Sequence, residues 1–249
     1  MRLTDVLSLA ADDLLAAWGV AAAMDTIEVS TLDQARLTGW RHAASTVDTL
    51  VHPTAEVSPH AVLSDDVIVG PGCIIHEFAT VRDRSILAAG VEIGHGCEVA
   101  RCVLASGTRL AHQVVLCDAI VGRGAHLSAA VILGSVHLWN DDMAHPDRPI
   151  SIRLDGRTRY SCRRPKFGGV LGDAVRVGMG ALLGPGLIVG AGSVIYPQVI
   201  AGEQVIPADS VVRPDTPRLR IQPRRDRQPA FGGEPAPAAQ QLTLVSQVS

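Results

Sequence analysis

The chain has few aromatic side chains, with three Trp, two Tyr and three Phe in a sequence of 249 residues that is 47% hydrophobic. Aromatic rings normally supply much of a globular core, because each buries about 150–250 Å². Here the apolar side chains are mainly Val, Ile, Leu and Ala. A core of small branched residues is expected in thin, regularly stacked layers, and the 24 Gly and 15 Pro residues exclude an all-helical protein.

The sequence also lacks the marks of several other protein classes. No segment approaches the ~18 uninterrupted apolar residues of a membrane span, and Asp5, Asp12 and Asp13 interrupt the N-terminal apolar run, unlike a signal peptide. The net charge of −3 argues against nucleic acid as the main partner. The five Cys residues form no CxxC pair, so neither a disulfide framework nor a zinc knuckle is indicated. We therefore expect a cytoplasmic protein that holds no metal and binds neither membranes nor nucleic acid.

The sequence does contain a six-residue repeat. A branched aliphatic residue recurs at every sixth position from Val51 to Val99, and the period returns between Leu171 and Ile195; two five-residue steps lead to Leu104 and Val121. A period of six fits neither a helix nor a long alternating strand, but it fits a short parallel strand followed by a turn. Three such units make one triangular coil, in which each aliphatic residue stacks on another about eighteen residues away. The repeat predicts an all-β parallel β-helix of about seven coils over residues 51–213.

A second position of the repeat carries small or branched residues. These follow each aliphatic residue by four positions, from Ala55 to Val103, and include Cys73 and Cys97. We expect all of them to point inward, with the two cysteines as core filler.

Three regions lie outside the repeat. Residues 1–50 are predicted to form an α-helical N-terminal cap on the open first coil, with helices over 4–18, where Thr4 is a candidate N-cap, and over 31–44. Residues 139–169 carry six Arg and Lys166 and are predicted to form a loop insertion or hairpin outside the coil wall. Residues 214–249 are rich in Pro and Arg and are interpreted as a flexible C-terminal tail.

Four motifs occur in a fixed order along the repeat. They are EFATVR (77–82), GCEVAR (96–101), AHQVVLCD (111–118) and RRPKFGGVLGD (163–173). Together they resemble the hexapeptide-repeat, left-handed β-helix acyltransferase superfamily. They are particularly similar to the acetyltransferase domain of the bifunctional glucosamine-1-phosphate N-acetyltransferase/UDP-N-acetylglucosamine pyrophosphorylases of archaeal type. The resemblance covers roughly residues 51–213, without the nucleotidyltransferase domain. It implies a left-handed coil, acetyl-CoA or another acyl-CoA as co-substrate, and a homotrimer.

The resemblance also implies roles for individual residues on the acceptor side. His112 corresponds to the general base, a task that suits imidazole near neutral pH. Arg82 corresponds to the arginine that holds the phosphate of the acceptor, for which a forked, permanently charged guanidinium is well suited. Arg101 or Lys166 would assist Arg82. The remaining substrate-binding candidates are His126 and Ser135.

On the donor side, the resemblance places Met179 and Pro197 along the pantetheine of CoA, with Tyr196 beside them. Arg213 lies near the position of an arginine that contacts the CoA phosphates.

The chain departs from the family pattern around the acceptor. Ala100 replaces a lysine, Val115 a tyrosine, Cys117 a glycine and Ser135 an asparagine. These departures argue against glucosamine 1-phosphate itself as the acceptor.

Three functions remain open from the sequence. The first is an acyl-CoA-dependent acyltransferase that acts on an amino or hydroxyl group of a sugar, a sugar phosphate or a small specialised metabolite by direct attack. The second is a catalytically degenerate ligand-binding or assembly protein on the same scaffold. The third is a metalloenzyme similar to the γ-class carbonic anhydrases, suggested by His95, His112 and His126, although Cys117 stands where that class has a second histidine.

Overall fold

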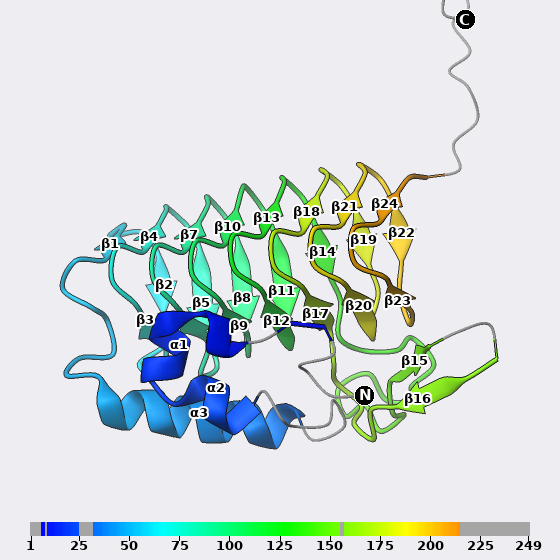
Figure 1. Cartoon of the computed structure of the whole chain (residues 1–249), viewed down its shortest axis with the longest axis horizontal. Helices are drawn as coiled ribbons and strands as arrows, with labels where there is room; N and C mark the ends of the chain where they lie inside the picture. The colour runs from blue at the N-terminus through cyan, green and yellow to red at the C-terminus, as the bar shows by residue number, and fades with distance from the viewer. Residues whose placement is uncertain (1–5, 8, 25–31, 155–156, 215–249) are drawn as a thin grey trace, which may run out of the picture. The chain divides into compact units, whose positions relative to one another are not determined.

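Three parallel sheets form the walls of a solenoid in the computed structural model (Figure 1). The structure describes residues 6–7, 9–24, 32–154 and 157–214, and these lie in one compact unit, Met1–Pro214. Sheet 1 consists of β1 (Glu56–Val57), β4 (Ile74–Ile75), β7 (Glu92–Ile93), β10 (Arg109–Leu110), β13 (His126–Leu127), β18 (Arg176–Val177), β21 (Val194–Ile195) and β24 (Val211–Val212). Sheet 2 consists of β2 (Val62–Leu63), β5 (Thr80–Arg82), β8 (Glu98–Ala100), β11 (Val115–Cys117), β14 (Ile132–Leu133), β19 (Leu182–Leu183) and β22 (Ile200–Ala201). Sheet 3 consists of β3 (Ile68–Val69), β6 (Ile86–Leu87), β9 (Val103–Leu104), β12 (Ala119–Val121), β17 (Gly169–Leu171), β20 (Leu187–Val189) and β23 (Val205–Ile206).

Each coil contributes one strand to each sheet, which confirms the predicted all-β parallel β-helix. The register also confirms the stacking distance, since Val57 pairs with Ile75, eighteen positions later in the chain. The number of coils is slightly higher than the predicted seven. Sheet 1 alone has eight strands, and Val51 adds an isolated parallel bridge to Val69 before β1.

The inward side chains form one aliphatic core along the solenoid. Its members are the aliphatic residues of the repeat together with small residues such as Cys73 and Cys97, both of which are buried and free. One inward prediction is wrong: Val103 belongs to the cluster outside sheet 3, and Cys102 takes the inward position instead. The reason is the five-residue step from Val99 to Leu104, which removes one residue from the corner and shifts the inward position by one.

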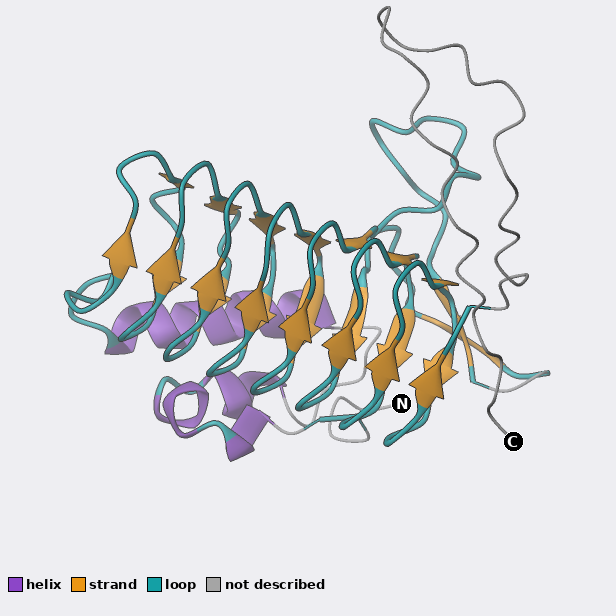
Figure 2. Cartoon of the chain, turned by 90° about the horizontal axis from the view of Figure 1, so that it is seen from above, coloured by secondary structure: helices purple, strands orange, loops and turns teal. Residues whose placement is uncertain are grey.

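The N-terminal helices pack along the outer face of sheet 3. They are α1 (Asp13–Ala17), preceded by a 3-10 turn (Leu9–Ala11), α2 (Val20–Met24) and α3 (Leu32–Thr46). Figure 2 shows α3 running parallel to the solenoid, beside its earlier coils. This differs from the predicted cap on the first coil. The outer face of sheet 3 carries Ile68, Ile86 and Ile120, which are buried in a common cluster with the helices, so it is this aliphatic wall that the helices cover.

The predicted helix over 4–18 is divided into shorter pieces. Asp12 is the N-cap of α1, where its carboxylate accepts hydrogen bonds from the Leu14 and Leu15 amides, each at 3.1 Å. Gly19 has a φ of 72° and separates α1 from α2. The predicted N-cap, Thr4, lies outside the described residues. The second prediction, a helix over 31–44, matches α3.

The insertion leaves the solenoid between β14 and β17. It contains an antiparallel hairpin of β15 (Ser151–Arg153) and β16 (Arg159–Ser161). Ile150, Ile152 and Phe167 are fully buried in the same outer cluster as the helices, together with Val170 and Ile188 of sheet 3. The helices and the insertion therefore share one wall of the solenoid (Figure 1). The predicted tail lies almost entirely outside the described residues, and no described helix is long and apolar enough to cross a membrane.

Candidate active site and basic pocket

His112 lies on the corner between sheets 1 and 2, in the turn from β10 to β11, and is exposed. Its carbonyl oxygen accepts a hydrogen bond from the Ala130 amide at 2.9 Å, and the next residue, Gln113, donates its amide to the His95 carbonyl at 2.9 Å. The turn is therefore anchored to both neighbouring coils. Within the described part of the chain, no hydrogen bond is formed by the His112 ring, so the imidazole is accessible to a ligand.

Other aromatic rings occupy earlier coils of the same corner. Phe78 is 63% exposed and lies between two histidines. It stacks on His60, with ring centroids 5.9 Å apart, and meets the edge of His95 at 5.4 Å. This corner thus presents an exposed row of rings that leads along the solenoid toward His112.

The four donor-side candidates gather on later coils of this corner. The Gln198 amide, next to Pro197, donates to the Met179 carbonyl at 3.1 Å, and Met179 is 62% exposed. The Arg213 guanidinium lies 4.8 Å from the centroid of the Tyr196 ring, and its Nη2 donates to the tyrosine hydroxyl at 3.4 Å. The structure therefore brings together Met179, Tyr196, Pro197 and Arg213, which the sequence spreads over 35 positions.

The corner between sheets 2 and 3 is built by the two five-residue steps of the repeat. Each step leaves a single residue in the left-handed region: Arg101 has a φ of 57° and Asp118 a φ of 53°. The Asp118 amide donates to the Ala100 carbonyl at 3.0 Å, so the two residues lie in adjacent coils. The shortened corner therefore holds their side chains against each other.

Arg101 is the centre of an ion-pair network. Its Nε and Nη2 donate to the two carboxylate oxygens of Asp118 at 2.8 and 3.1 Å, and its Nη1 donates to Asp83 at 2.6 Å. The Asp118 carboxylate is only 4% exposed, whereas the Arg101 side chain remains 27% exposed. The hydrogen bond to Asp118 raises the pKa of Arg101 above its ordinary value. The pair is bidentate, the geometry in which guanidinium and carboxylate fit best.

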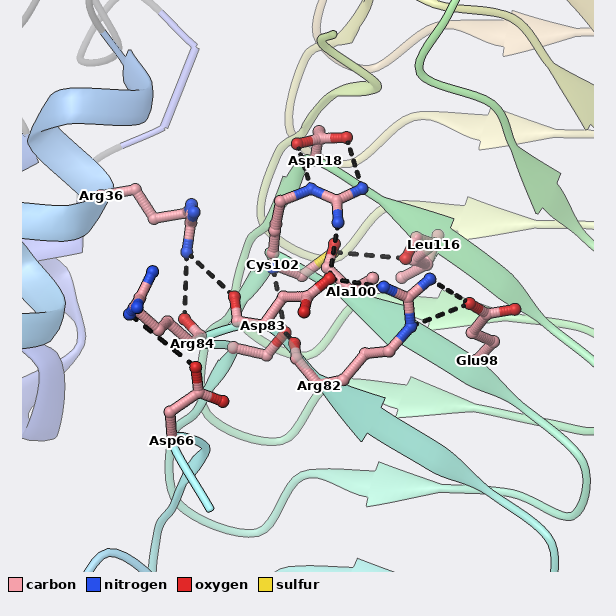
Figure 3. A network of polar contacts seen from close by, with 12 residues as sticks. Arg36, Asp66, Arg82, Asp83, Arg84, Glu98, Ala100, Cys102, Leu116 and Asp118 are labelled. Atoms are coloured by element: carbon pink, nitrogen blue, oxygen red, sulfur yellow. Dashed lines mark hydrogen bonds and ion pairs between the residues drawn. The ribbon is translucent and has the colours of Figure 1, made fainter. Parts of the chain in front are cut away.

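Arg82 joins the same network from the end of β5. Its Nη2 donates to Glu98 at 2.6 Å, and its Nη1 contacts the Asp83 carboxylate (Figure 3). The hydrogen bond to Glu98 raises the pKa of Arg82. Both arginines that the sequence assigns to the acceptor are therefore already paired with carboxylates of their own chain.

A basic pocket opens beside this corner, with a volume of about 580 Å³. Helix α3, the corner and the last part of the insertion form its walls. Lys166, predicted from the sequence, lines it together with Arg101. The full lining is Gln34, Arg36, Leu37, Arg84, Arg101, Asp118, Arg163, Arg164, Pro165 and Lys166.

Two other predicted residues lie apart from these groups. His126 is on the outward face of sheet 1, in register between Arg109 and Arg176, and so is on a different wall from Arg82. Ser135 is buried at the start of the insertion, where its carbonyl accepts the Phe167 amide at 2.9 Å.

His112 and the arginine network lie on opposite edges of sheet 2. The strand β11 lies between His112 and Asp118, and six residue steps at the rise of an extended strand separate the two positions by roughly 20 Å. The structure therefore does not bring all the predicted acceptor residues to one point of a single chain.

The pocket contains residues that the sequence argument missed. Arg36 of α3 donates through Nη1 to the carbonyls of Asp83 and Arg84 at 3.4 and 3.1 Å, which ties the helix to the corner (Figure 3). In the sequence, the pair of five-residue steps could have indicated this corner as the place of a site, since both steps fall on it. The α3 contribution had no such signal, because nothing local indicates which wall a helix will cover.

The cysteines do not have the properties of a catalytic nucleophile. Burial raises the pKa of Cys117, which faces outward on sheet 2, and raises those of Cys102 and Cys162 to about 12. A raised pKa lowers the fraction of reactive thiolate at neutral pH. Among the described residues, no group of three or more His, Cys, Asp or Glu could hold a metal ion.

Known proteins match part of this chain. Residues 46–148 match the model of the family described as the GMPPB C-terminal domain. This match agrees with the hexapeptide-repeat resemblance drawn from the sequence. The chain is also 51% identical over 51 residues to the carnitine operon protein CaiE of Escherichia coli O1:K1 and to that of Escherichia fergusonii. That stretch is 19% of this chain and 26% of the relatives, so the chain matches about a quarter of their length.

Two solved structures are similar to parts of this chain. Arabidopsis UDP-N-acetylglucosamine acyltransferase is 17% identical, with a TM-score of 0.34, over 68% of this chain and 69% of that chain. PerB from Caulobacter crescentus, in complex with CoA and GDP-perosamine, is 20% identical, with a TM-score of 0.26, over 69% of this chain and 61% of that chain. These TM-scores are too low to transfer an activity.

Proposed function

We propose that this protein is an acyl-CoA-dependent acyltransferase, with acetyl as the transferred group. Its acceptor is an amino or hydroxyl group of a sugar, a sugar phosphate or a small specialised metabolite. The observation that carries the proposal is the composition of the corner between sheets 1 and 2. An exposed histidine and the four donor-side candidates lie along this one edge. The family resemblance implies that the histidine is the base and that the other four residues bind CoA.

The chemistry requires one base and a polarised thioester. The amine or hydroxyl of the acceptor attacks the thioester carbonyl carbon, the carbon–sulfur bond breaks, and CoA leaves as a thiolate. His112 takes the proton from the attacking group and returns it to the CoA sulfur. Backbone amides stabilise the oxyanion of the tetrahedral intermediate. Transfer is direct, because the raised thiol pKa values argue against an acyl-cysteine intermediate.

The acceptor is proposed to bind through the other residues that the family resemblance implies. Arg82 orients its anionic group, with Arg101 or Lys166 assisting. His126 and Ser135 remain proposed contacts of the acceptor, although they lie on other parts of the chain. The cytoplasm is the proposed compartment, since the five free cysteines suit a reducing environment.

A homotrimer is part of the proposal. The outward column of sheet 2 becomes apolar in its second half, where Val115, Ile132, Leu182 and Ile200 lie in register. Ile200 is 80% exposed. Contiguous exposed apolar surface is typical of a protein interface. Within one chain, His112 and the arginine network lie on opposite edges of sheet 2. An interface on this wall would bring a second chain close to both edges.

A calorimetric titration tests the proposal directly. The purified 249-residue chain is expected to bind acetyl-CoA at micromolar to millimolar concentrations. Replacing His112 with Ala should leave this binding unchanged and lower transfer to the preferred amine or hydroxyl acceptor by about 10²–10⁴-fold, the range for a general base. A His145→Ala variant is the matched control, because His145 is an exposed histidine of the insertion. Failure of the wild-type chain to bind acetyl-CoA at millimolar concentration would overturn the proposal.

A binding or assembly protein is the second candidate. It is favoured by the ion pairs of Arg82 and Arg101, whose guanidinium groups are already bound by Glu98, Asp83 and Asp118. This candidate predicts that His112→Ala has the same biological output as the wild-type protein. A folded but inactive His112→Ala variant would exclude it.

A further inference from the structure

We infer that the basic pocket between α3 and the insertion is a binding site for a phosphorylated small molecule. The site is formed by two segments outside the repeat together with one corner of the solenoid. Arg101 and Lys166 also belong to the proposed acceptor site, so the inference rests on the proposed function at these two residues and assigns the phosphate of the ligand to this pocket. Binding of phosphate in the pocket does not require His112 to act as a base.

The charge of the lining is the first argument. Six cationic side chains line the pocket, and Asp118 is the only carboxylate among its lining residues. The whole chain, by contrast, carries a net charge of −3. A concave surface lined by charges of one sign concentrates its field and attracts an opposite ion.

The pairing of these cations is the second argument. Arg101 is bound by Asp118 and Asp83, and Arg84 lies 3.8 Å from Asp66. Arg163 and Lys166 are exposed and form no ion pair with any carboxylate in the described part of the chain. Two cations of the insertion are therefore available for a ligand, while the paired arginines provide a fixed wall behind them.

The local backbone holds these groups at the pocket. The Arg163 amide donates to the Ser161 hydroxyl at 3.2 Å, and Arg163 has a φ of 54°, which turns the chain sharply after β16. The Arg164 Nε donates to the Lys166 carbonyl at 2.6 Å and closes the loop that carries Lys166. Cations on an ordered loop lose less conformational entropy when a ligand binds than cations on a free chain.

Size and shape favour a small molecule. The volume of about 580 Å³ lies within the range of small-ligand sites, roughly 300–1,000 Å³. Leu37 and Pro165 provide apolar surface beside the cations, which suits a phosphate attached to an organic group. Guanidinium and ammonium groups together are the usual protein contacts of phosphate oxygens.

Titration of the 249-residue chain with inorganic pyrophosphate tests the site. We expect one equivalent to bind at low ionic strength and the affinity to fall as salt is added, because the attraction is screened. The double variant Arg163→Ala/Lys166→Ala should bind pyrophosphate about tenfold more weakly or worse. Both residues are exposed and unpaired with carboxylates, so the variant is expected to keep the wild-type melting temperature, which is measured in parallel.

A matched control removes the same charge elsewhere. Arg109→Ala/Arg176→Ala takes two arginines from the outer face of sheet 1 and lowers the net charge by the same amount. It should bind pyrophosphate within about twofold of wild type. Equal weakening in both double variants would mean that only the overall charge matters and would overturn the site, as would failure of the wild-type chain to bind at millimolar pyrophosphate.

Two further experiments distinguish this site from the proposed reaction and identify which ligand supplies the phosphate. His112→Ala should bind pyrophosphate as the wild-type protein does, and loss of binding in that variant would contradict a separate site. Competition between pyrophosphate and acetyl-CoA would support the site and assign it to the diphosphate of CoA. Additive binding of the two would support it as the site of another phosphorylated ligand.

Discussion

At the scale of single residues, the most constrained pair is Arg101 and Asp118. A buried carboxylate is costly unless a cation and hydrogen bonds compensate it, and here one guanidinium supplies both. The two residues meet because each occupies a corner that is one residue shorter than the repeat requires. The same shortening moves Cys102 inward and Val103 outward.

Replacing Arg101 with Ala should destabilise the fold by roughly 2–4 kcal/mol, because it leaves the buried Asp118 carboxylate without its partner. The range is below the full cost of a buried pair, since the Arg101 side chain is still partly exposed. Urea unfolding measures the difference. The double variant Arg101→Ala/Asp118→Ala should be more stable than the single Arg101→Ala variant, and a double variant that is less stable would contradict this account.

At the scale of elements, α3 matters more than its weak sequence signal indicates. It provides one wall of the basic pocket and is attached to the solenoid by specific contacts. The Trp40 Nε1 donates to the Asp66 carbonyl at 2.8 Å, and the Trp40 ring lies 5.8 Å from the Arg84 guanidinium. The same tryptophan therefore docks the helix and orders a cation of the pocket.

Replacing Trp40 with Ala should lower the free energy of unfolding by about 2–4 kcal/mol, because a large, half-buried ring and its hydrogen bond are lost. Trp40→Phe keeps most of the ring and should cost about 1 kcal/mol. Trp139→Ala is the control, because Trp139 is 76% exposed on the insertion, and it should change stability by less than about 0.5 kcal/mol. Equal effects at the two tryptophans would argue against docking through Trp40.

At the scale of the whole molecule, the three walls of the solenoid differ in what covers them and in which side chains they expose. Sheet 3 is covered by the helices and the insertion, and sheet 1 presents charged residues such as Glu92, Arg109 and Arg176. Sheet 2 keeps the exposed apolar column that we propose as the subunit interface. A solenoid has no internal cavity, so which wall stays open decides where a site can form.

The proposed trimer predicts a sedimentation mass about three times that of the 26.2 kDa chain. Replacing both Leu182 and Ile200 with Asp should convert it to single chains, because charges would be buried in the interface. Val211→Asp is the control, as Val211 is an exposed apolar residue of sheet 1 and should leave the mass unchanged. A wild-type chain that sediments as a monomer would exclude the trimer.

The candidate site was predictable only in part. His112, Met179, Tyr196 and Pro197 could be placed because each occupies a turn position whose location is set by counting along the repeat. Arg36 and Arg163 could not be placed in this way, since they lie on segments without a period. Ser135 and His126 were grouped with the arginines only by the family resemblance, and the structure puts them on different parts of the solenoid.

The sequence by itself determined the coil. A side chain that recurs every six residues, with a small one four positions later, fits only a narrow three-walled core, and this requirement also explains the scarcity of aromatic rings. Only the tertiary structure decided which wall the helices and the insertion cover, and therefore where the basic pocket lies. The reason is physical: the inward pattern is fixed by neighbours one coil away, whereas the choice of wall depends on apolar surfaces from segments far apart in the sequence, such as the N-terminal helices and Ile188.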